Sequence, residues 1–255
     1  MQISHLLFTR FNIQFDQYAT AGIQPEWLED RIGLFETYCL PSVLRQTCRD
    51  FMWIIIGDVR TPQKYKTKIE QYTALAPNIR VLWWAFKAED EDYHIPFSQL
   101  ATDYAKNADV LITSRIDNDD TISPDYIQRI QEEAKKGIVG FITFPIGKQT
   151  FVHSHKSYVI RYVQNHFLSR VETSDFKTVM SHNHALIDKS NLYCVKTEQP
   201  MWEEIVHGGN VHNDFEPKYR YILHSWRDFS DWSIQWILFI RKRINRLFRS
   251  HYNQR

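Results

Sequence analysis

The chain has 255 residues, 43% of them hydrophobic and 15% aromatic, and it carries 31 Lys and Arg against 30 Asp and Glu. This length and apolar content exclude a disordered protein, and they are enough for one large domain or two small ones with a substantial core. The formal net charge of +1 gives no general electrostatic case for a nucleic-acid partner, and none is expected.

The cysteine content and the lack of long apolar runs indicate the cellular compartment in which the protein is expected. Cys39, Cys48 and Cys194 form no Cys-x-x-Cys pair, so neither a structural zinc site nor a disulfide framework is predicted. The amino-terminal residues lack the charged start and apolar stretch of a signal peptide, and no run reaches the length of a membrane span. We therefore expect a cytoplasmic protein in a reducing environment.

Apolar runs alternate with helical patterns through the first half of the chain. Strands are predicted over residues 4–11, 51–58 and 78–84, and helices over residues 25–38, from residue 61, and over 97–105. Pro41 is expected to begin a second helical segment after the first helix. Alternating strands and helices predict an α/β fold, a mostly parallel, doubly wound sheet with helices on both faces.

Residues 110–120 form the central feature, an apolar, β-branched run that ends in three carboxylates within four residues. A buried strand of this kind places its acids at the carboxyl end of the sheet, where open α/β folds bind ligands. Asp117 and Asp119 have the Asp-x-Asp spacing, whose oxygens can hold Mg²⁺ or Mn²⁺ beside the phosphates of a nucleotide. The alternative is a solvated loop before a helix that Ser123 and Pro124 begin.

The pattern changes after a predicted helix over residues 124–136. Two strands are predicted over residues 140–145 and 151–161, joined by a turn that contains Gly147. This hairpin predicts an antiparallel addition to the sheet. The polar segment 164–198 is expected to form loops on the side of the acceptor substrate.

The carboxyl-terminal segment has a different composition. Apolar and aromatic residues recur at helical spacing from Trp232 onward, interleaved with arginines and a lysine, and no acid follows Asp231. A basic amphipathic helix of this kind predicts peripheral attachment to the inner face of a membrane. The alternative is a terminal helix packed on its own domain. We expect a domain over residues 1–225 and a tail over 226–255.

Several segments together carry a resemblance to known enzymes: residues 10–12, 27–31, 34–43, 115–120 and 207–210. Their pattern resembles glycosyltransferases of the GT-A fold, a Rossmann-like fold in which an Asp-x-Asp motif holds a divalent cation and the diphosphate of a nucleotide sugar. It resembles still more closely a bacterial rhamnosyltransferase family, over residues 5–215. The resemblance implies metal-dependent transfer of a sugar to a hydroxyl of a surface glycan or a lipid-linked acceptor.

The resemblance also implies ligands for the cation and the donor. Asp117 and Asp119 correspond to the metal motif, and His207 is the candidate for a third metal ligand, with His182 and His184 as alternatives. The candidate contacts of the nucleotide sugar are Thr9, Arg10, Asp58, Arg115 and Asp117. Arginine side chains offset phosphate charge, and a carboxylate accepts hydrogen bonds from a base or a ribose.

A general base is needed to deprotonate the acceptor hydroxyl if the sugar is transferred with inversion. Glu203 and Glu204 precede His207 and are the candidates, with Asp120 and Glu172 as alternatives. For Arg31, which falls in a predicted helix, an ordinary ion pair is expected.

Two other functions fit parts of the pattern. A sugar-nucleotide nucleotidyltransferase would use a similar sheet and metal, but it needs a glycine-rich phosphate loop, and the chain has no glycine before Gly22. A non-catalytic glycan-binding module would use exposed aromatic residues to stack on sugars, although core packing accounts for most of them.

Overall fold

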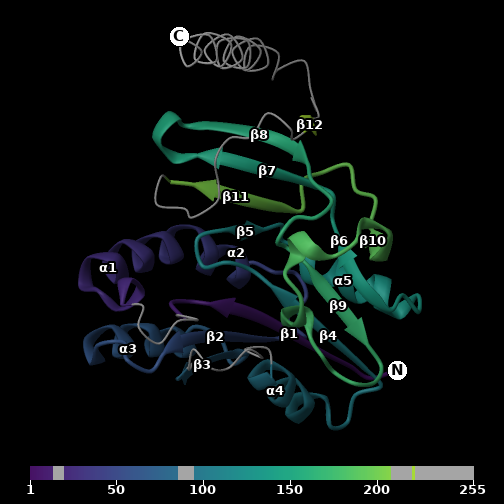
Figure 1. Ribbon diagram of the computed structural model, residues 1–255, viewed down its shortest axis with the longest axis horizontal. Helices are drawn as coiled ribbons and strands as arrows, with labels where there is room; N and C mark the ends of the chain where they lie inside the picture. The colour runs from purple at the N-terminus through teal and green to yellow at the C-terminus, as the bar shows by residue number, and fades with distance from the viewer. Residues whose placement is uncertain (14–19, 86–94, 208–219, 222–255) are drawn as a thin grey trace, which may run out of the picture.

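The computed structural model describes residues 1–13, 20–85, 95–207 and 220–221. A seven-stranded main sheet has the order β10-β6-β9-β4-β1-β2-β3 (Figure 1). Its strands are β1 (Ile3–Arg10), β2 (Met52–Asp58), β3 (Ile79–Trp84), β4 (Val110–Arg115), β6 (Gly140–Thr143), β9 (Ser169–Glu172) and β10 (Leu192–Cys194). The strands β1 to β4 are parallel to one another, and β9 runs antiparallel between β4 and β6. The predicted mostly parallel α/β sheet is confirmed.

Helices cover both faces of the main sheet because alternate side chains of its buried strands point to opposite sides. The helices are α1 (Pro25–Leu34), α2 (Leu40–Leu44), α3 (Gln63–Glu70), α4 (Ile95–Ala105) and α5 (Tyr126–Lys135). Leu7 and Ile55 pack on one face in a cluster with residues of α1, α2, α3 and α5. Leu6 and Ile54 pack on the other face with α4.

The first helical region is one continuous helix rather than two. A π-helical turn, η2 (Phe35–Cys39), joins α1 to α2, and the Leu40 N–H donates to the Phe35 carbonyl five residues earlier. Proline lacks an N–H, so Pro41 cannot donate to Thr37 four residues back, and the hydrogen-bond register shifts just before it. The expected second helical segment is α2, with Pro41 in its first turn, and the π-helical turn makes that segment continuous with α1.

A second sheet of five strands has the order β12-β8-β7-β11-β5. Its strands are β5 (Thr121–Ile122), β7 (Ile146–Phe151), β8 (Lys156–Arg161), β11 (Trp202–Val206) and β12 (Arg220–Tyr221). The antiparallel addition is confirmed, but Gly147 lies inside β7 and not in a turn. A Cβ at Gly147 would lie 2.1 Å from the Trp202 ring, so glycine is required there for close packing. The β7–β8 hairpin turns instead at Val152–Ser154.

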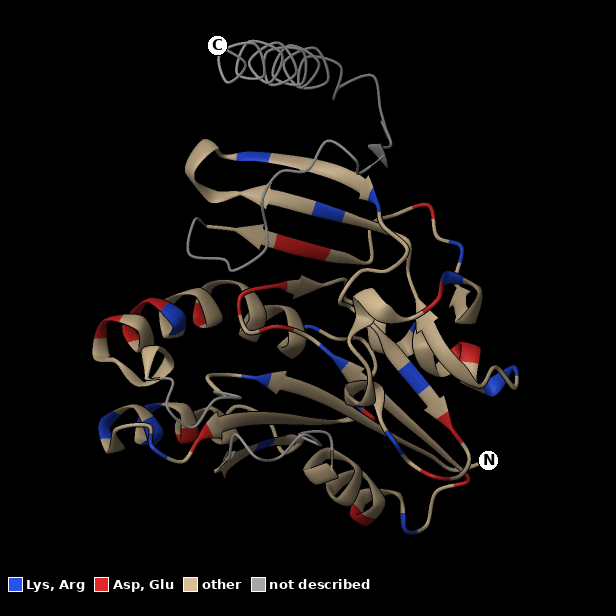
Figure 2. Ribbon diagram, viewed as in Figure 1, with Lys and Arg blue, Asp and Glu red and all other residues tan. Residues whose placement is uncertain are grey.

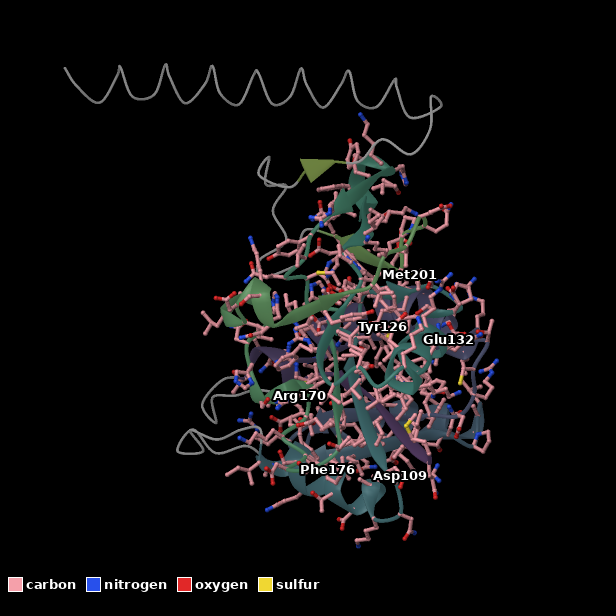
Figure 3. The ribbon with its side chains drawn as sticks, turned by 90° about the vertical axis from the view of Figure 1, so that its right-hand side faces the viewer. Asp109, Tyr126, Glu132, Arg170, Phe176 and Met201 are labelled. Carbon is pink, nitrogen blue, oxygen red and sulfur yellow. The ribbon has the colours of Figure 1, made fainter. Side chains whose placement is uncertain are left out.

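Two hydrogen bonds position the segment that follows β5. The Ser123 N–H donates to the Met201 carbonyl at 3.0 Å, and the Tyr126 hydroxyl donates to the Phe167 carbonyl at 2.8 Å. Met201 and Tyr126 are both labelled in the side view (Figure 3). The first bond fixes the start of β11 against the end of β5, and the second holds α5 against the segment that precedes β9.

The predicted basic tail over residues 226–255 lies outside the described residues, so the division into a domain and a tail stays a prediction. Among the helices that the structure describes, none has the length and apolar character needed to cross a membrane.

Candidate active site

The acidic turn, residues 116–120, is held between the two sheets. It follows β4, the central strand of the main sheet, and leads into β5, which pairs antiparallel with β11 of the second sheet. The Ile205 N–H of β11 donates to Asp120 Oδ1 at 2.9 Å. Because β11 ends one residue before His207, this pairing brings His207 to the acidic turn from 88 residues away in the sequence.

Asp119 is held by two side chains from different parts of the chain. Its Oδ2 accepts from Arg31 at 2.5 Å and lies 3.0 Å from His207 Nε2, and its side chain is only 10% exposed. Arg31 also donates to Asn118 Oδ1 at 3.1 Å, and its guanidinium lies over the Trp27 ring. The ion pair expected for Arg31 is therefore formed with a residue of the acidic motif itself.

Asp120 is 2% exposed and pairs with a histidine that the sequence did not single out. His166 Nε2 lies 2.7 Å from Asp120 Oδ2. Burial raises the pKa of Asp120 above its ordinary value. Burial alone would lower the pKa of His166, but the hydrogen bond and charge of Asp120 outweigh it and raise that pKa. The pair therefore shares a proton in a buried position.

Asp117 is the most exposed of the three acids, with 36% of its side chain accessible and Arg10 at 3.7 Å. Burial acts to raise the pKa of Asp117, but the charges of His166, Arg115 and Arg10 outweigh it and hold the pKa below its ordinary range. Asp117 is therefore ionised at neutral pH and open to a ligand.

Three ligand atoms, one each from Asp117, Asp120 and His166, lie within 4.8 Å of one another. This group can hold a metal ion, and two carboxylates with one imidazole are a donor set that suits Mn²⁺. The set predicted from the sequence, Asp117, Asp119 and His207, shares only Asp117 with this group. Both sets combine two carboxylates of the acidic turn with a histidine from another segment, so the residues present fit a divalent cation.

The two candidate bases lie on opposite faces of the second sheet because they are consecutive in β11. Glu203 pairs with Lys148 at 2.9 Å and accepts hydrogen bonds from Thr150 and Thr121. Figure 2 shows the acidic segment of β11 beside the basic segment of β7. Glu204 is 9% exposed and accepts a hydrogen bond from Gln149.

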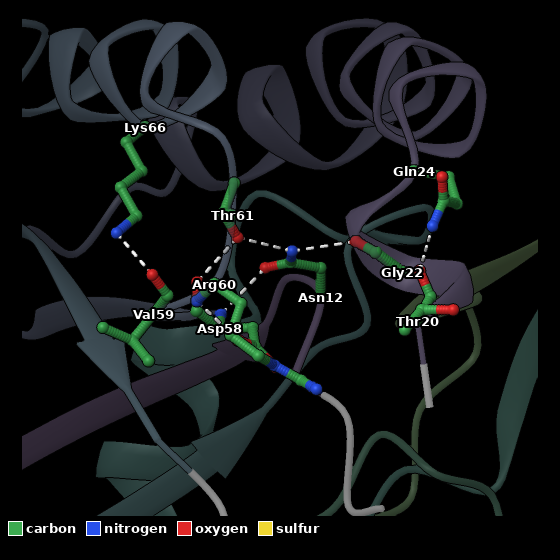
Figure 4. A network of polar contacts seen from close by, with 9 residues as sticks. All are labelled: Asn12, Thr20, Gly22, Gln24, Asp58, Val59, Arg60, Thr61 and Lys66. Atoms are coloured by element: carbon green, nitrogen blue, oxygen red, sulfur yellow. Dashed lines mark hydrogen bonds and ion pairs between the residues drawn. The ribbon is translucent and has the colours of Figure 1, made fainter. Parts of the chain in front are cut away.

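The predicted nucleoside contacts lie at the ends of β1 and β2. Thr9 is fully buried, and its hydroxyl accepts from Trp53 Nε1 at 2.9 Å. Asp58 is also buried and accepts from the backbone and the guanidinium of Arg60. Asn12 connects Asp58 to Thr61 in the network shown in Figure 4. The structure thus places Asp58 in a polar network and Thr9 within the core.

The alternative histidines contact residues far away in the sequence, and the centroid of the His184 ring lies 5.9 Å from that of His166, whereas Glu172 makes local contacts. His184 Nδ1 lies 2.7 Å from the Gln164 carbonyl, and burial lowers the pKa of His184 to about 4. The His182 ring packs against Phe141. Glu172 accepts from the backbone N–H groups five and six residues later. Each contact holds the segment in which the residue lies.

Residues 8–219 match the protein family described as "putative rhamnosyl transferase". The match covers well over half of the chain, and the chain therefore belongs to this glycosyltransferase family. The resemblance identified from the sequence is confirmed. No curated protein is significantly similar to the chain.

Solved structures of S. aureus TarS are among those that the chain resembles weakly. A crystal structure of S. aureus TarS has a TM-score of 0.46 at 10% identity, over 81% of this chain and 37% of that one. TarS 1–349 in complex with UDP-GlcNAc has a TM-score of 0.45 at 10% identity, over 82% and 60%. The complex with UDP has a TM-score of 0.41 at 11% identity, over 81% and 61%. The chain thus spans 37% to 61% of the length of these structures, and they assign it no substrate.

Proposed function

We propose that this protein transfers a sugar from a nucleoside-diphosphate sugar to a hydroxyl of a glycan or a lipid-linked acceptor, with a divalent cation as cofactor. The observation that carries the proposal is the acidic turn of a glycosyltransferase family member, where three carboxylates meet His166 and His207 between two sheets. The family description makes a rhamnosyl group the first donor sugar to test, in surface polysaccharide synthesis.

Asp117 would hold the cation together with a second carboxylate of the acidic turn and a histidine from outside it. Asp119 with His207, or Asp120 with His166, completes the set. An imidazole ligand favours Mn²⁺, because Mg²⁺ prefers oxygen ligands in a near-ideal octahedron. When bound, such a cation stabilises the negative charge that develops on the leaving diphosphate.

Arginine side chains beside the turn are suited to bind the diphosphate. Arg10 is partly exposed at 3.7 Å from Asp117. Arg115, which is buried, lies close enough to Asp117 to lower its pKa. Charge-assisted hydrogen bonds from guanidinium groups to phosphate oxygens are strong and directional. Both side chains therefore belong on the donor side of the site.

Glu204 is the base that the geometry favours, for transfer with inversion. Glu203 is paired with Lys148 and accepts hydrogen bonds from two threonines, so its oxygens already have partners. Glu204 instead lies next to Ile205, which is hydrogen-bonded to the acidic turn. General-base catalysis requires a carboxylate within reach of the acceptor hydroxyl.

Calorimetric titration with UDP, GDP, CDP and dTDP, with and without Mn²⁺, tests this function. We expect tight binding of one diphosphate, seen only with Mn²⁺ and lost in Asp117→Ala. Asp103→Ala is the matched control, because Asp103 is an exposed acid paired with Lys106, and it should bind like the wild type. Binding of none of the four would contradict the proposal and favour a glycan-binding module. Binding of a nucleoside triphosphate together with a sugar phosphate would instead favour a nucleotidyltransferase.

A further inference from the structure

Glu204 and Gln149 are adjacent partners in the second sheet. The strands β7 and β11 are parallel, and their register pairs Gln149 with Glu204. Side chains of paired residues leave the same face of a sheet, and Gln149 Nε2 donates a hydrogen bond to Glu204 Oε2. Gln149 is 1% exposed, so this hydrogen bond is shielded from water on the Gln149 side.

The other end of the Gln149 amide has no such partner. Within the described residues, Gln149 Oε1 is buried and accepts no hydrogen bond. The amide cannot turn over to satisfy Oε1, because its carbonyl would then face the Glu204 carboxylate. Buried polar atoms are nearly always hydrogen-bonded. The amide is therefore held in one orientation by Glu204, at the expense of an unsatisfied acceptor.

The same sheet face is locked in place by aromatic packing. The Trp202 ring, two residues before Glu204 on β11, covers Gly147, two residues before Gln149 on β7. It stacks on Phe167 with ring centroids 4.9 Å apart and donates to the Phe144 carbonyl at 2.7 Å. Gln149 and Glu204 thus sit on a rigid platform, which suits a catalytic group.

The titratable groups facing Glu204 come from the segment between β8 and β9. Tyr162 and His166 both interact with it electrostatically, and Asp120 lies beyond them, bonded to His166 and to the Ile205 N–H. On the opposite face, Lys148 is paired with Glu203. The hydrogen-bond donor of the Glu204 carboxylate is therefore an amide and not a cation. Glu204 precedes Ile205, whose N–H is bonded to the acidic turn.

We propose that Gln149 is a positioning residue that holds the Glu204 carboxylate oriented toward the acceptor hydroxyl. This inference rests on the proposed function. The hydrogen bond from Gln149 occupies Oε2, so Oε1 of Glu204 receives the acceptor proton. The acceptor oxygen forms the bond to the anomeric carbon of the donor sugar, and the bond from that carbon to the diphosphate oxygen breaks. The diphosphate leaves with the electron pair of that bond.

The test compares Gln149→Met and Gln149→Glu with Lys148→Met, which changes the neighbouring residue on the opposite face. Gln149→Met keeps the size of the side chain but cannot donate. We expect kcat for transfer to fall about 10- to 100-fold, the value of a hydrogen bond to a charged group, with KM little changed. The acid limb of the pH–rate profile should move to higher pH, because the carboxylate loses its donor.

Gln149→Glu retains polarity and size, so it provides a second variant if Gln149→Met does not fold. Two adjacent carboxyl groups hold a proton between them, and the acid limb should again move to higher pH. Lys148→Met should keep the wild-type pH profile. Wild-type kcat and an unmoved profile in either folded Gln149 variant would overturn the inference.

Metal-dependent diphosphate binding separates failure of this inference from failure of the proposed function. All the Gln149 and Lys148 variants should bind diphosphate like the wild type, because neither residue lies in the acidic turn. Full transfer by Glu204→Gln, with diphosphate binding intact, would overturn the role of Gln149 and leave the transferase standing. Absence of diphosphate binding and of transfer in the wild-type protein would overturn both.

Discussion

The two faces of the second sheet treat adjacent glutamates in opposite ways. On one face, Glu203 has a cation and two hydroxyl groups as partners. On the other, Glu204 has a neutral amide whose own carbonyl is unsatisfied. Glu203 is thus fixed by charged and polar partners, and Glu204 by one uncharged donor. In the proposed function, Glu203 belongs to the scaffold and Glu204 is the base.

We expect the largest change in kcat when each of the two carboxylates is replaced separately by an amide. Glu204→Gln should reduce kcat by about 10²–10⁴-fold, the usual contribution of a general base, with diphosphate binding retained. Glu203→Gln keeps its hydrogen-bonding partners and should retain most of its activity. The measurement is transfer from the donor whose nucleotide the titration identifies. Equal losses of kcat in the two variants would contradict the different roles of Glu203 and Glu204.

Arg31 extends the comparison to the acidic turn, where Asp119 does have a cationic partner. Arg31→Met should lower the free energy of unfolding by about 3–5 kcal/mol, because it removes the partner of a largely buried carboxylate. Chemical denaturation measures the loss. Lys106→Met is the control, since its pair with Asp103 is exposed, and the denaturation midpoint should not change. Equal midpoints for both variants would contradict a structural role for the Arg31 pair.

Gly147 tests how rigid the platform under Gln149 and Glu204 is. Gly147→Ala places a Cβ about 2.1 Å from the Trp202 ring, and overpacking of this kind costs about 1–3 kcal/mol. Gly33→Ala is the matched control, because a Cβ there meets nothing within 4 Å in a helix, and it should stabilise the protein slightly. Thermal unfolding of the two variants provides the comparison. Unchanged stability of Gly147→Ala would show that the Trp202 ring can shift to accept the added Cβ, so that this part of the sheet is not rigid.

His5 provides the corresponding case in the main sheet, a buried group without a charged partner. Its Nε2 lies 2.8 Å from Ser114 Oγ, and burial lowers the pKa of His5 to about 3. The unfolded chain therefore binds a proton that the folded chain does not, below about pH 6.5. Stability should fall as the pH drops from 6.5 toward 3, by about 2 kcal/mol at pH 5.

His5→Gln removes this titration and should flatten that part of the pH dependence, measured by urea unfolding at pH 7.5 and pH 5. If the wild type and the variant lost the same stability over this range, burial of neutral His5 would not be the cause. His5 could then no longer be compared with Glu204 as a buried group without a charged partner.

The strands of the main sheet were predictable because they are continuous apolar runs. The bounds of β1, β2 and β3 lie within one residue of the predicted strands. The short strands β9 and β10 were missed, since three or four residues carry too little pattern in a polar segment. Gly147 was assigned to a turn because glycine favours turns, but here its missing side chain makes room for an indole.

The residues of the candidate site likewise differ in whether a local sequence pattern marks them. Asp117, Asp119 and Asp120 were predictable because a buried strand leads directly into them. His166 and Gln149 were not, since no local motif marks a residue whose partner lies 46 or 55 positions away. The pairing of β4 with β9 brings His166 to Asp120, and the pairing of β7 with β11 brings Gln149 to Glu204. Both pairings depend on the tertiary fold.

The most direct test of the central claim is the calorimetric titration with nucleoside diphosphates, because it identifies the donor nucleotide on which every transfer assay depends. The account predicts that one diphosphate binds only with Mn²⁺, that Asp117→Ala abolishes the binding, and that Gln149→Met leaves it intact. Diphosphate binding that is unaffected by Mn²⁺ and by Asp117→Ala would contradict the assignment of the acidic turn as the cation and diphosphate site.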